Sequence, residues 1–296
     1  MSTKIAVIVL NYKGLEDTLE CIESLKRCTT KGIDLDIIVV DNNSDDGSVE
    51  ALSKIKDIIL LSNDANLGFA GGNNTGIKEA LKRDDDLIII LNNDTYVDRQ
   101  FIKEMAKAII DADIISPKIY FAPGFEYHDK YNKEELGKVI WYAGGYIDWD
   151  NVIGHHIGVD EVDNGQYDRK KEIDLATGAC FGASARVFEN VGMFDEKYFL
   201  YLEEMDLCVR AKRAGFKLAF APKAVIWHKN ARSTGGSGSK LQDYYITRNR
   251  LLFAFKWAKI RTKFAVLRQV IGQAGSSVKR KALIDFLTFN FGKGDF

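Results

Sequence analysis

Short apolar runs alternate with amphipathic segments through the first third of the chain, and this alternation limits the possible folds more than any other feature. Each run has the length of a strand and is bounded by polar residues. Strands that are apolar along their whole length are buried on both faces, as in a parallel sheet covered by helices. The apolar runs lie at residues 5–10, 35–40, 58–61 and 87–91, and the amphipathic segments at 15–25, 49–55 and 76–81. The sequence therefore predicts an α/β fold with a mostly parallel central sheet flanked by helices.

The pattern changes after a fifth expected strand at residues 113–116. Residues 117–172 form a long stretch rich in Gly, Tyr, Trp and His, and a stretch of this length without regular structure is uncommon unless it has a function. We expect it to contain short antiparallel strands at 139–142 and 145–149. A helix is predicted further on, at about residues 203–214, where it ends before Gly215.

Residues 241–296 differ from the rest of the chain in charge. They hold eleven Lys and Arg against three Asp, although the whole chain has a formal net charge of −1. Apolar residues are interleaved with these cations, as expected for helices with one apolar and one cationic face. Two interpretations stay open: the apolar face packs on the domain, or this tail docks on an anionic bilayer surface.

No stretch is long and apolar enough for a membrane-spanning helix, and no signal peptide precedes the first apolar run. The four cysteines match no zinc or redox spacing, because no CxxC occurs. We therefore expect a cytoplasmic protein, with the inner face of the membrane as a further location if the tail docks there.

Polar residues follow the expected strands at the points where each strand ends. In open parallel sheets, ligands bind at the carboxyl ends of the strands. Asp41 ends the second run, and its carboxylate could accept a hydrogen bond from the ring N3–H of uracil or thymine. Asp46 and Ser48, further along, also fit a plain helix cap. The clusters are Asn11 and Tyr12, Asp41 to Asp46, Asn63 to Asn66, and Asn92 to Asp94.

Three glycines, Gly68, Gly71 and Gly72, stand just before an expected helix in the segment NLGFAGGNN. Backbone without side chains can approach a ligand closely and present N–H groups to it. An ordinary turn explains these residues equally well. The chain has no Walker motif here, and no GxGxxG follows the first strand.

The segment LNNDT places Asp94 at the end of a buried strand. A Mg²⁺ or Mn²⁺ ion that bridges the phosphates of a nucleotide-sugar takes one or two ligands from the protein. Asp94 fits this role with Asn92 as a neutral partner, although a polar turn has the same composition. His228 ends the apolar run of AVIWHKN; a lone histidine is usually structural, but as a ligand of the same ion it would favour Mn²⁺.

Glu203 and Glu204 begin the helix predicted near residue 203, where the helix dipole favours negative charge. Helix stabilisation alone explains them, yet an inverting displacement needs a carboxylate that accepts the proton of the attacking hydroxyl. Asp206 and Arg210, four residues apart, fit an ion pair within the helix.

Two further features lie near the start of the basic tail. Residues 233–239 are rich in Gly and Ser and are expected to form a mobile lid. Arg248 either reaches a phosphate group or begins the cationic helix face.

The order of these motifs along the chain is more specific than any one of them. Together, VIVLNYKG, VVDNNSDDGS, NLGFAGGNN, LNNDT, TGACFGASARVFENVGMFDEKYFLYLEEMDL and the Trp-His pair resemble family 2 of the inverting glycosyltransferases, which have the GT-A fold. The resemblance covers about residues 4–249. Within that family, NLGFAGGNN with LNNDT is most similar to the rhamnosyltransferase-like branch, which builds bacterial surface polysaccharides from dTDP-L-rhamnose.

The resemblance implies a metal-dependent enzyme that moves a sugar from a dTDP-, UDP- or GDP-linked donor to a glycan or lipid-linked glycan acceptor, with no nucleic-acid partner. It implies that Asp41 contacts the base, that Asp94 and His228 hold Mn²⁺ or Mg²⁺, and that Tyr244 or Arg248 lies near the diphosphate. The expected nucleotide-sugar contacts are Asn11, Tyr12, Asp41, Asn43, Asn66, Gly68, Gly72, Asn73, Asn92, Asn93, Asp94 and Arg248.

The sequence departs from the commonest family pattern at two points. Asn92 stands where the first Asp of a DxD-type motif is expected, and Glu203-Glu204 stands where a Glu-Asp pair is expected. The resemblance implies that one of these two glutamates is the catalytic base, and Glu204 is favoured.

The same resemblance sets the expected domains. Residues 1–240 form a GT-A glycosyltransferase domain, with a nucleotide-binding half at about 1–116 and an acceptor half at about 117–240. A basic amphipathic helical tail follows at 241–296. The alternative is a non-catalytic sugar-nucleotide-binding subunit with the same fold, because fold alone does not fix function.

Overall fold

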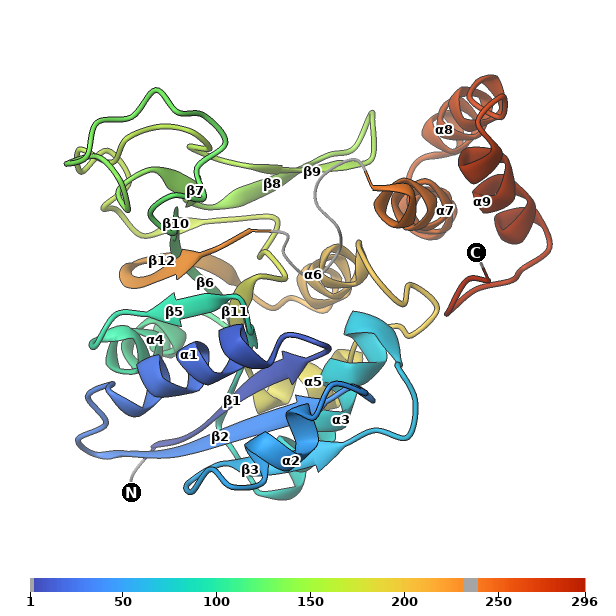
Figure 1. Cartoon of the computed structure of the whole chain (residues 1–296). Coiled ribbons are helices and arrows are strands. Elements are labelled where there is room, and N and C mark those ends of the chain that lie inside the picture. Colours follow the sequence, from blue (N-terminus) through green and yellow to red (C-terminus); the bar gives the residue numbers. More distant parts are fainter. Residues whose placement is uncertain (1–2, 231–238, 296) are drawn as a thin grey trace.

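The computed structural model describes residues 3–230 and 239–295 of the chain. One large sheet runs through the molecule in the strand order β10-β12-β6-β11-β4-β1-β2-β3, with β5 added to β12 and β7 added to β6 (Figure 1). The strands are β1 Thr3–Asn11, β2 Ile33–Asp41, β3 Ile59–Ser62, β4 Leu87–Asn92, β5 Thr95–Val97, β6 Ile114–Phe121, β7 Ile140–Tyr142, β8 Gly145–Asp148, β9 Ile153–His156, β10 Lys171–Glu172, β11 Cys180–Ser184 and β12 Leu218–His228.

The long strands of this sheet are mostly parallel, as predicted. β1, β2, β3 and β4 pair in parallel, and β6 and β12 run in the same direction beyond the reversed strand β11. The apolar runs of β1 and β4 are fully buried, because helices cover the strands on both faces. The expected α/β fold with helices flanking a mostly parallel sheet is therefore confirmed.

The helices follow the strands as the amphipathic segments predicted. α3 packs on β1 and β2, and α4 packs on β12. The helix expected near residues 203–214 is α6, and Gly215 follows it with φ +88°. The bounds are α1 Leu15–Lys26, α2 Ser48–Leu52, α3 Gly68–Lys82, α4 Phe101–Ala108, the 3₁₀ turn η1 Ile109–Asp111, α5 Ala185–Val191, α6 Glu203–Arg213, α7 Lys240–Trp257, α8 Ile260–Gly272 and α9 Ser277–Leu287.

The stretch predicted to be irregular is more ordered than expected. The strand expected at 113–116 is β6, which continues to Phe121 because its second half pairs with both β12 and β7. The two short strands expected further on are present as β7 and β8, and β8 forms an antiparallel hairpin with β9. This hairpin and the loops around it lie above the carboxyl edge of the sheet (Figure 1).

The C-terminal helices lie to one side of the sheet, and α7 packs most deeply (Figure 1). Leu251, Leu252, Phe253 and Ala254 of α7 belong to the same buried cluster as the central strands. α8 and α9 cover α7 on its outer side. In the described parts of the chain, no helix is long and apolar enough to cross a membrane. The division of the chain at residue 240 stays a prediction.

Candidate active site

The carboxyl edge of the sheet brings Asp94 and His228 together from distant parts of the sequence. Asp94 immediately precedes β5, and β5 pairs with the end of β12 so that Thr95 lies opposite His228. The Nε2 atom of His228 is 3.1 Å from Oδ1 of Asp94, and both side chains are almost completely buried. Lys229, the next residue, is fixed to α1 by ion pairs with Asp17 and Glu20, so the end of β12 is held on both sides.

Asp94 and His228 have polar atoms that the protein leaves without hydrogen bonds. Oδ1 of Asp94 and both ring nitrogens of His228 are buried and have no hydrogen-bond partner, since the 3.1 Å contact between them lacks hydrogen-bond geometry. Burial tends to raise the pKa of Asp94, but the adjacent His228 ring outweighs it and holds that pKa below the ordinary value. Orphaned buried polar atoms of this kind call for an explanation such as an ion.

A carboxylate oxygen beside an imidazole nitrogen is a donor set that suits Mn²⁺ or Mg²⁺. Within residues 3–230 and 239–295, no group of three or more His, Cys, Asp or Glu side chains is placed to hold a metal ion. Asp94 and His228 therefore fit an ion that takes its remaining ligands from a diphosphate and water, as is usual for nucleotide-bound Mg²⁺. Asn92, two residues before Asp94, is half-buried at the end of β4.

The acidic pair at the start of α6 faces the same edge of the sheet. A methyl group added at Gly178 would lie 3.8 Å from Glu204, and the neighbouring Ala179 accepts a hydrogen bond from the Asn92 N–H. Glu203 is only 3% exposed, and its Oε2 has no hydrogen-bond partner, whereas Glu204 is half-buried. Burial raises the pKa of both carboxyls, and for Glu203 the neighbouring Glu204 raises it further.

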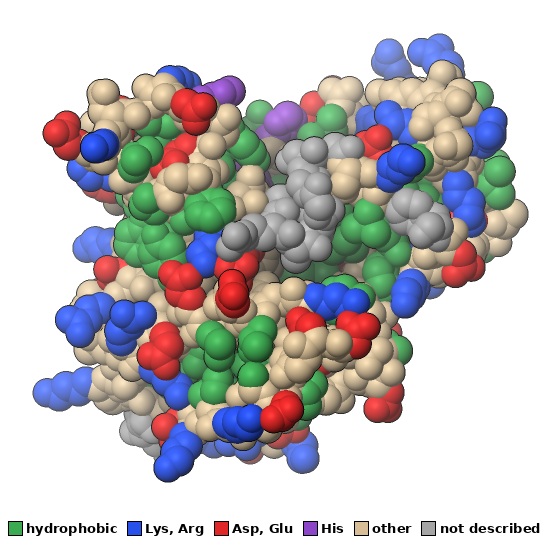
Figure 2. Space-filling view, viewed as in Figure 1, with side chains coloured by type: hydrophobic (Ala, Val, Ile, Leu, Met, Phe, Trp, Pro, Cys, Tyr) green, Lys and Arg blue, Asp and Glu red, His purple; other side chains and the backbone are tan. Residues whose placement is uncertain are grey.

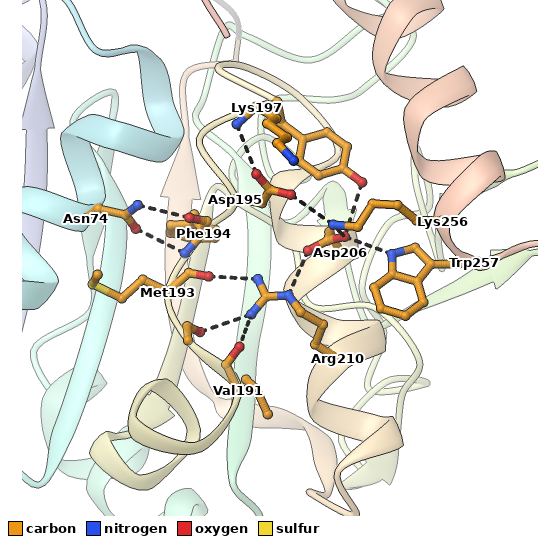
Figure 3. Close-up of polar contacts among 12 residues, drawn as sticks. Asn74, Val191, Met193, Phe194, Asp195, Lys197, Asp206, Arg210, Lys256 and Trp257 are labelled. Carbon is orange, nitrogen blue, oxygen red and sulfur yellow. Dashed lines mark hydrogen bonds and ion pairs between the residues drawn. The ribbon is translucent and has the colours of Figure 1, made fainter. Parts of the chain in front are cut away.

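The loop that leads into α6, residues 191–202, is held by side chains from three helices (Figure 3). Asn74 of α3 donates to the Phe194 carbonyl and accepts from the Phe194 N–H, both at 3.0 Å. Arg210 of α6 donates to the carbonyls of Val191, Gly192 and Met193. Its Nε also pairs with Asp206, as predicted, at 2.7 Å.

Asp206 connects this loop to α7 (Figure 3). Its completely buried carboxylate accepts from the Trp257 indole N–H at 2.8 Å, from the Tyr198 hydroxyl at 3.2 Å, and from Lys256 at 2.6 Å. Lys256 and Arg210 outweigh burial and lower the pKa of Asp206. The carboxylate is therefore a charged structural centre between α6 and α7.

The predicted nucleotide-contacting residues at the ends of β1 and β2 form a buried network. Asn11 and Asp41 are completely buried, and the Asn11 amide donates to Asp41 Oδ1 at 2.7 Å. The Ser44 N–H occupies the other carboxylate oxygen at 2.8 Å, and Asn93 joins the same network through Thr18. Each carboxylate oxygen of Asp41 thus accepts a hydrogen bond from within the protein, and its predicted contact with the base stays a prediction.

The glycine segment was predicted to lie before a helix, but it forms the first turns of α3. Gly68 begins the helix, and its N–H is taken by the Asn66 side chain. Gly72 is buried where a methyl group would lie 2.5 Å from Leu10, so this glycine permits close packing of α3 on β1. Asn73 is 1% exposed and donates to the Phe69 carbonyl. Gly68 and Gly72 therefore have packing roles, while Asn73 Oδ1 is buried without a hydrogen-bond partner, and the contact of these residues with a nucleotide-sugar stays a prediction.

Arg248 was predicted to reach a phosphate, and the structure contradicts this. The side chain is completely buried, and all five of its N–H groups are used. The acceptors are the carbonyls of Lys197, Tyr198 and Gly292, the Asn249 amide oxygen and the Tyr244 hydroxyl. Tyr244 is also completely buried and donates to Asp285. Neither residue is available to a diphosphate.

Several predicted contacts remain accessible at the surface of the site. Tyr12 is 37% exposed, Asn43 is exposed in a left-handed conformation with φ +64°, and the Asn66 side chain is half-buried. The Gly- and Ser-rich segment predicted to be a lid lies outside the described residues, apart from Ser239, which caps α7 through the Gln242 N–H.

No sequence pattern singled out Asn42, His156 or Asn249. His156 lies near the predicted metal ligands through Trp141, whose ring meets both His156 and His228 edge-on at 4.6 and 4.7 Å. Burial lowers the pKa of His156 to about 4, so its ring is neutral at physiological pH. A His-His pair in an irregular stretch gives no periodic signal that would have identified it.

The sequence is similar along most of its length to known sugar-transferring proteins. A family model described as Glycosyl transferase family 2 matches residues 6–192. The low-salt glycan biosynthesis hexosyltransferase Agl10 of Haloferax volcanii is 26% identical over 255 residues, which cover 85% of this chain and 76% of that protein. An N-acetylglucosaminyl-diphospho-decaprenol L-rhamnosyltransferase of Mycobacterium tuberculosis is 25% identical over 256 residues, covering 79% of each chain. The dTDP-rhamnosyl transferase RfbF of Shigella flexneri is 25% identical and covers 74% and 71%.

Solved structures share the fold at low sequence identity. GalNAc-T7 with UDP, GalNAc and Mn²⁺ superposes with a TM-score of 0.61 at 15% identity, over 84% of this chain and 51% of that one. This chain thus spans about half the length of GalNAc-T7. The mannosyltransferase PcManGT of Pyrobaculum calidifontis, in complex with GDP-Man and Mn²⁺, has a TM-score of 0.58 at 13% identity over 97% and 88%. The chain therefore has the GT-A fold.

Proposed function

We propose, from the premise that this chain belongs to glycosyl transferase family 2, that it is an inverting, divalent-metal-dependent glycosyltransferase with a nucleotide-diphosphate sugar as donor. The observation that carries the proposal is one edge of the sheet where the pair Asp94 and His228 has unpaired polar atoms. Glu204 lies beside Gly178, and the next residue, Ala179, bonds to Asn92 at that edge. These groups supply what a single displacement at an anomeric carbon needs, namely a base and a site for the leaving diphosphate.

Glu204 acts as the base in this proposal. It accepts the proton of the acceptor hydroxyl while the hydroxyl oxygen forms a bond to the anomeric carbon, and the bond from that carbon to the diphosphate oxygen breaks. Glu204 is more exposed than Glu203 and lies against Gly178, which has no side chain of its own. A carboxylate with a raised pKa is a stronger base than an ordinary glutamate once it is ionised. Inversion follows because the hydroxyl attacks from the face opposite the diphosphate.

Asp94 and His228 would hold the metal ion. When bound, Mn²⁺ or Mg²⁺ neutralises negative charge on the departing diphosphate. The Asn at position 92 adds no charge, so Asp94 is the carboxylate of the LNNDT segment that serves the ion. The chain's own contribution is to keep this donor pair buried and oriented through the pairing of β5 with β12.

The proposed donor is dTDP-L-rhamnose, and the proposed acceptor is a lipid-linked or surface glycan. Two relatives whose names specify rhamnosyl transfer support this choice. A UDP- or GDP-linked donor is the alternative, because Agl10 is named only as a hexosyltransferase, and the solved neighbours carry UDP and GDP-Man.

An anionic bilayer is the proposed docking surface for the C-terminal helices, which would bring the site to a lipid-linked acceptor. Lys and Arg side chains gather over these helices at the upper right of Figure 2. One face of α8 is buried through Thr262, Val266 and Val270. The opposite face exposes Ile260, Phe264 and Ile271 by 67%, 60% and 55%, with Arg261 and Arg268 beside them. An apolar stripe bordered by cations is typical of helices that lie on anionic membranes.

Replacing Ile260, Phe264 and Ile271 together with Ser should reduce sedimentation with phosphatidylglycerol vesicles by at least about tenfold, because apolar burial and charge attraction act jointly. Ile110→Ser is the control, because Ile110 is 80% exposed on η1, outside the C-terminal helices. This variant should sediment with the vesicles as the wild type does. Equal sedimentation of the triple variant and the wild type would leave only the packing role.

A thermal-shift panel tests the proposed donor most directly. The wild-type protein is heated with dTDP, UDP or GDP, each with and without MnCl₂, and a ligand that binds only the folded state raises the Tm. We expect the largest rise in Tm with dTDP and Mn²⁺. In a separate activity assay, the protein should release dTDP from dTDP-L-rhamnose only when Mn²⁺ is present. Binding without any turnover, even with glycan acceptors, would favour the non-catalytic subunit instead.

A further inference from the structure

The residues just before the acidic pair adopt an unusual backbone conformation. Phe199, Tyr201 and Leu202 have φ values of +63°, +72° and +70°. Bulky residues rarely adopt this left-handed region, and such strain persists only where surrounding contacts impose it. We call residues 198–202 the strained segment. The contacts that impose its conformation should therefore be identifiable.

Asn249 of α7 makes the largest number of these contacts. The two N–H groups of its side-chain amide are shared among the carbonyls of Tyr198, Leu200 and Tyr201, whose oxygens lie 2.8, 2.8 and 2.9 Å from the nitrogen. The amide is completely buried, and its oxygen accepts from the Arg248 Nε at 3.0 Å. That bond fixes the orientation of the amide, so that its N–H groups must point at the segment.

Arg248 holds the start of the segment. Its guanidinium donates to the carbonyls of Lys197 at 3.2 Å and Tyr198 at 3.0 Å. A third bond, at 2.8 Å, goes to the Gly292 carbonyl after α9. The strained segment is thus tied through α7 to the C-terminal end of the chain.

The strained segment lies between the start of α3 and the acidic pair. On one side, the Ala70 N–H in the first turn of α3 donates to the Phe199 carbonyl at 3.2 Å. A side chain at Gly68 would collide with that carbonyl, since a methyl group there would lie 2.3 Å from it. On the other side, Leu202 leads directly into Glu203 and Glu204, and its carbonyl accepts the first-turn bond from the Asp206 N–H.

We propose that Asn249 and Arg248 are positioning residues that hold the strained segment in the conformation that aims Glu204 at the reacting centre. The inference rests on the proposed function, because it assigns Glu204 as the base. It makes α7 part of the catalytic apparatus, although α7 lies beyond the matched family region that ends at residue 192. It also gives the YYITRNR segment a role other than phosphate binding.

The experiment compares Asn249→Ala with Leu252→Ala, a matched variant on the same helix. Leu252 is 8% exposed and belongs to the main core, so Leu252→Ala removes packing of α7 but no hydrogen bond to the strained segment. We expect Asn249→Ala to lower kcat for release of dTDP from dTDP-L-rhamnose by at least about tenfold while KM changes less than about twofold, because a misplaced base affects chemistry more than binding. Leu252→Ala should lower the Tm and leave kcat within about twofold. Equal kcat losses in the two variants would overturn the proposal.

A second variant separates backbone positioning from packing. Glycine adopts positive φ without strain, so Leu202→Gly in the Asn249→Ala background should restore kcat about threefold or more, although it removes a packed side chain. A double variant that is slower than Asn249→Ala would contradict the positioning role. If Asn249→Ala does not fold, Asn249→Ser takes its place in both comparisons.

Amide hydrogen exchange supplies a readout that needs no substrate. The Asn249 variant should exchange faster at Asp206 and through residues 199–206, with protection in β4 unchanged. Unchanged exchange in that segment would overturn the inference even if activity fell. If the wild type releases no nucleotide from any donor, the proposed function fails, and the exchange result still decides whether Asn249 holds the segment.

Discussion

Two groups of buried polar side chains share the carboxyl edge of the sheet, and they differ in how completely the protein satisfies them. Asn42, just after β2, uses both ends of its side-chain amide. The nitrogen donates to the Asn66 side-chain oxygen and to the Gly68 carbonyl. The oxygen accepts from the Asn63 side-chain amide and from the Leu67 N–H. Asp94 and His228 lie at the same edge with three polar atoms that have no hydrogen bond.

We infer that this difference separates the structural network around Asn42 from the functional pair Asp94 and His228. A buried polar atom without a partner costs about 1–3 kcal/mol, and a fold keeps such a group only where something else requires it. A fully satisfied network stabilises its own geometry and has nothing left to offer a ligand. We therefore expect substitutions in the satisfied group to reduce stability, and substitutions in the unsatisfied group to reduce activity while stability is kept.

The largest expected effect belongs to Glu204→Gln. Removing a general base reduces the rate by about 10²–10⁴-fold, and the amide keeps the size of the side chain. Because burial raises the pKa of Glu204 above its ordinary value of 4.5, the wild-type kcat/KM should fall as the pH drops through a pKa above 4.5. The pH–rate profile of the Gln variant should lack that acid limb.

Glu203→Gln is the matched control, because it makes the same change one residue away on a side chain that is 3% exposed. Its loss of activity should be much smaller than that of Glu204→Gln. A larger loss of activity for Glu203→Gln would make Glu203 the base in place of Glu204.

Asp94→Asn should have the next largest effect. A metal ion contributes several kcal/mol to stabilising the leaving group, so its loss should lower kcat/KM by about 10²–10³-fold. The Tm should fall only slightly, since the variant loses the attraction between the carboxylate and His228 that lowers the pKa of Asp94 but keeps the size of the side chain. Isothermal titration with MnCl₂ and dTDP should show weaker metal binding. Loss of folding in this variant would contradict the distinction between the two groups.

The sequence predicted the fold well because apolar strands and their polar ends are local features. It also pointed to Asp94 and His228, since each is close to an element boundary that periodicity reveals, and the two side chains lie 3.1 Å apart. The role of Glu204 stays a prediction. It failed where the outcome depends on tertiary packing. Nothing local shows that Gly72 and Gly76 pack α3 on β1, or that Arg248 uses all its donors inside the protein.

Asn42→Asp tests the satisfied group. The substitution replaces two N–H donors with a charged oxygen that faces the Asn66 amide oxygen and the Gly68 carbonyl. Unfolding in urea at pH 7 should show a loss of about 2–4 kcal/mol, the cost of leaving buried acceptors unpaired around a charge. Metal binding by Asp94 should be unaffected in the folded fraction. A variant as stable as the wild type would show that hydrogen-bond satisfaction does not identify the structural group.

Asp85, at the other end of the sheet, tests whether every buried polar atom without a hydrogen bond marks a functional site. It is 3% exposed near the start of β4, and its Oδ2 has no hydrogen bond, yet it lies away from the candidate active site. Burial, followed by the nearby Asp36, raises the pKa of Asp85 to about 6. The carboxyl is therefore mostly ionised at pH 7, where its unpaired oxygen lowers the stability of the fold.

The pH dependence of Asp85→Asn should show this. A carboxyl whose pKa is about 6 when folded and near 4 when unfolded costs stability as the pH rises from about 4 to 6, and the cost stays above that range. Asp85→Asn should therefore raise the free energy of unfolding by about 1–2 kcal/mol at pH 7 and change it little at pH 4, with kcat unaltered. A gain of equal size at both pH values would trace the effect to packing, and a loss of activity would make Asp85 a functional group after all.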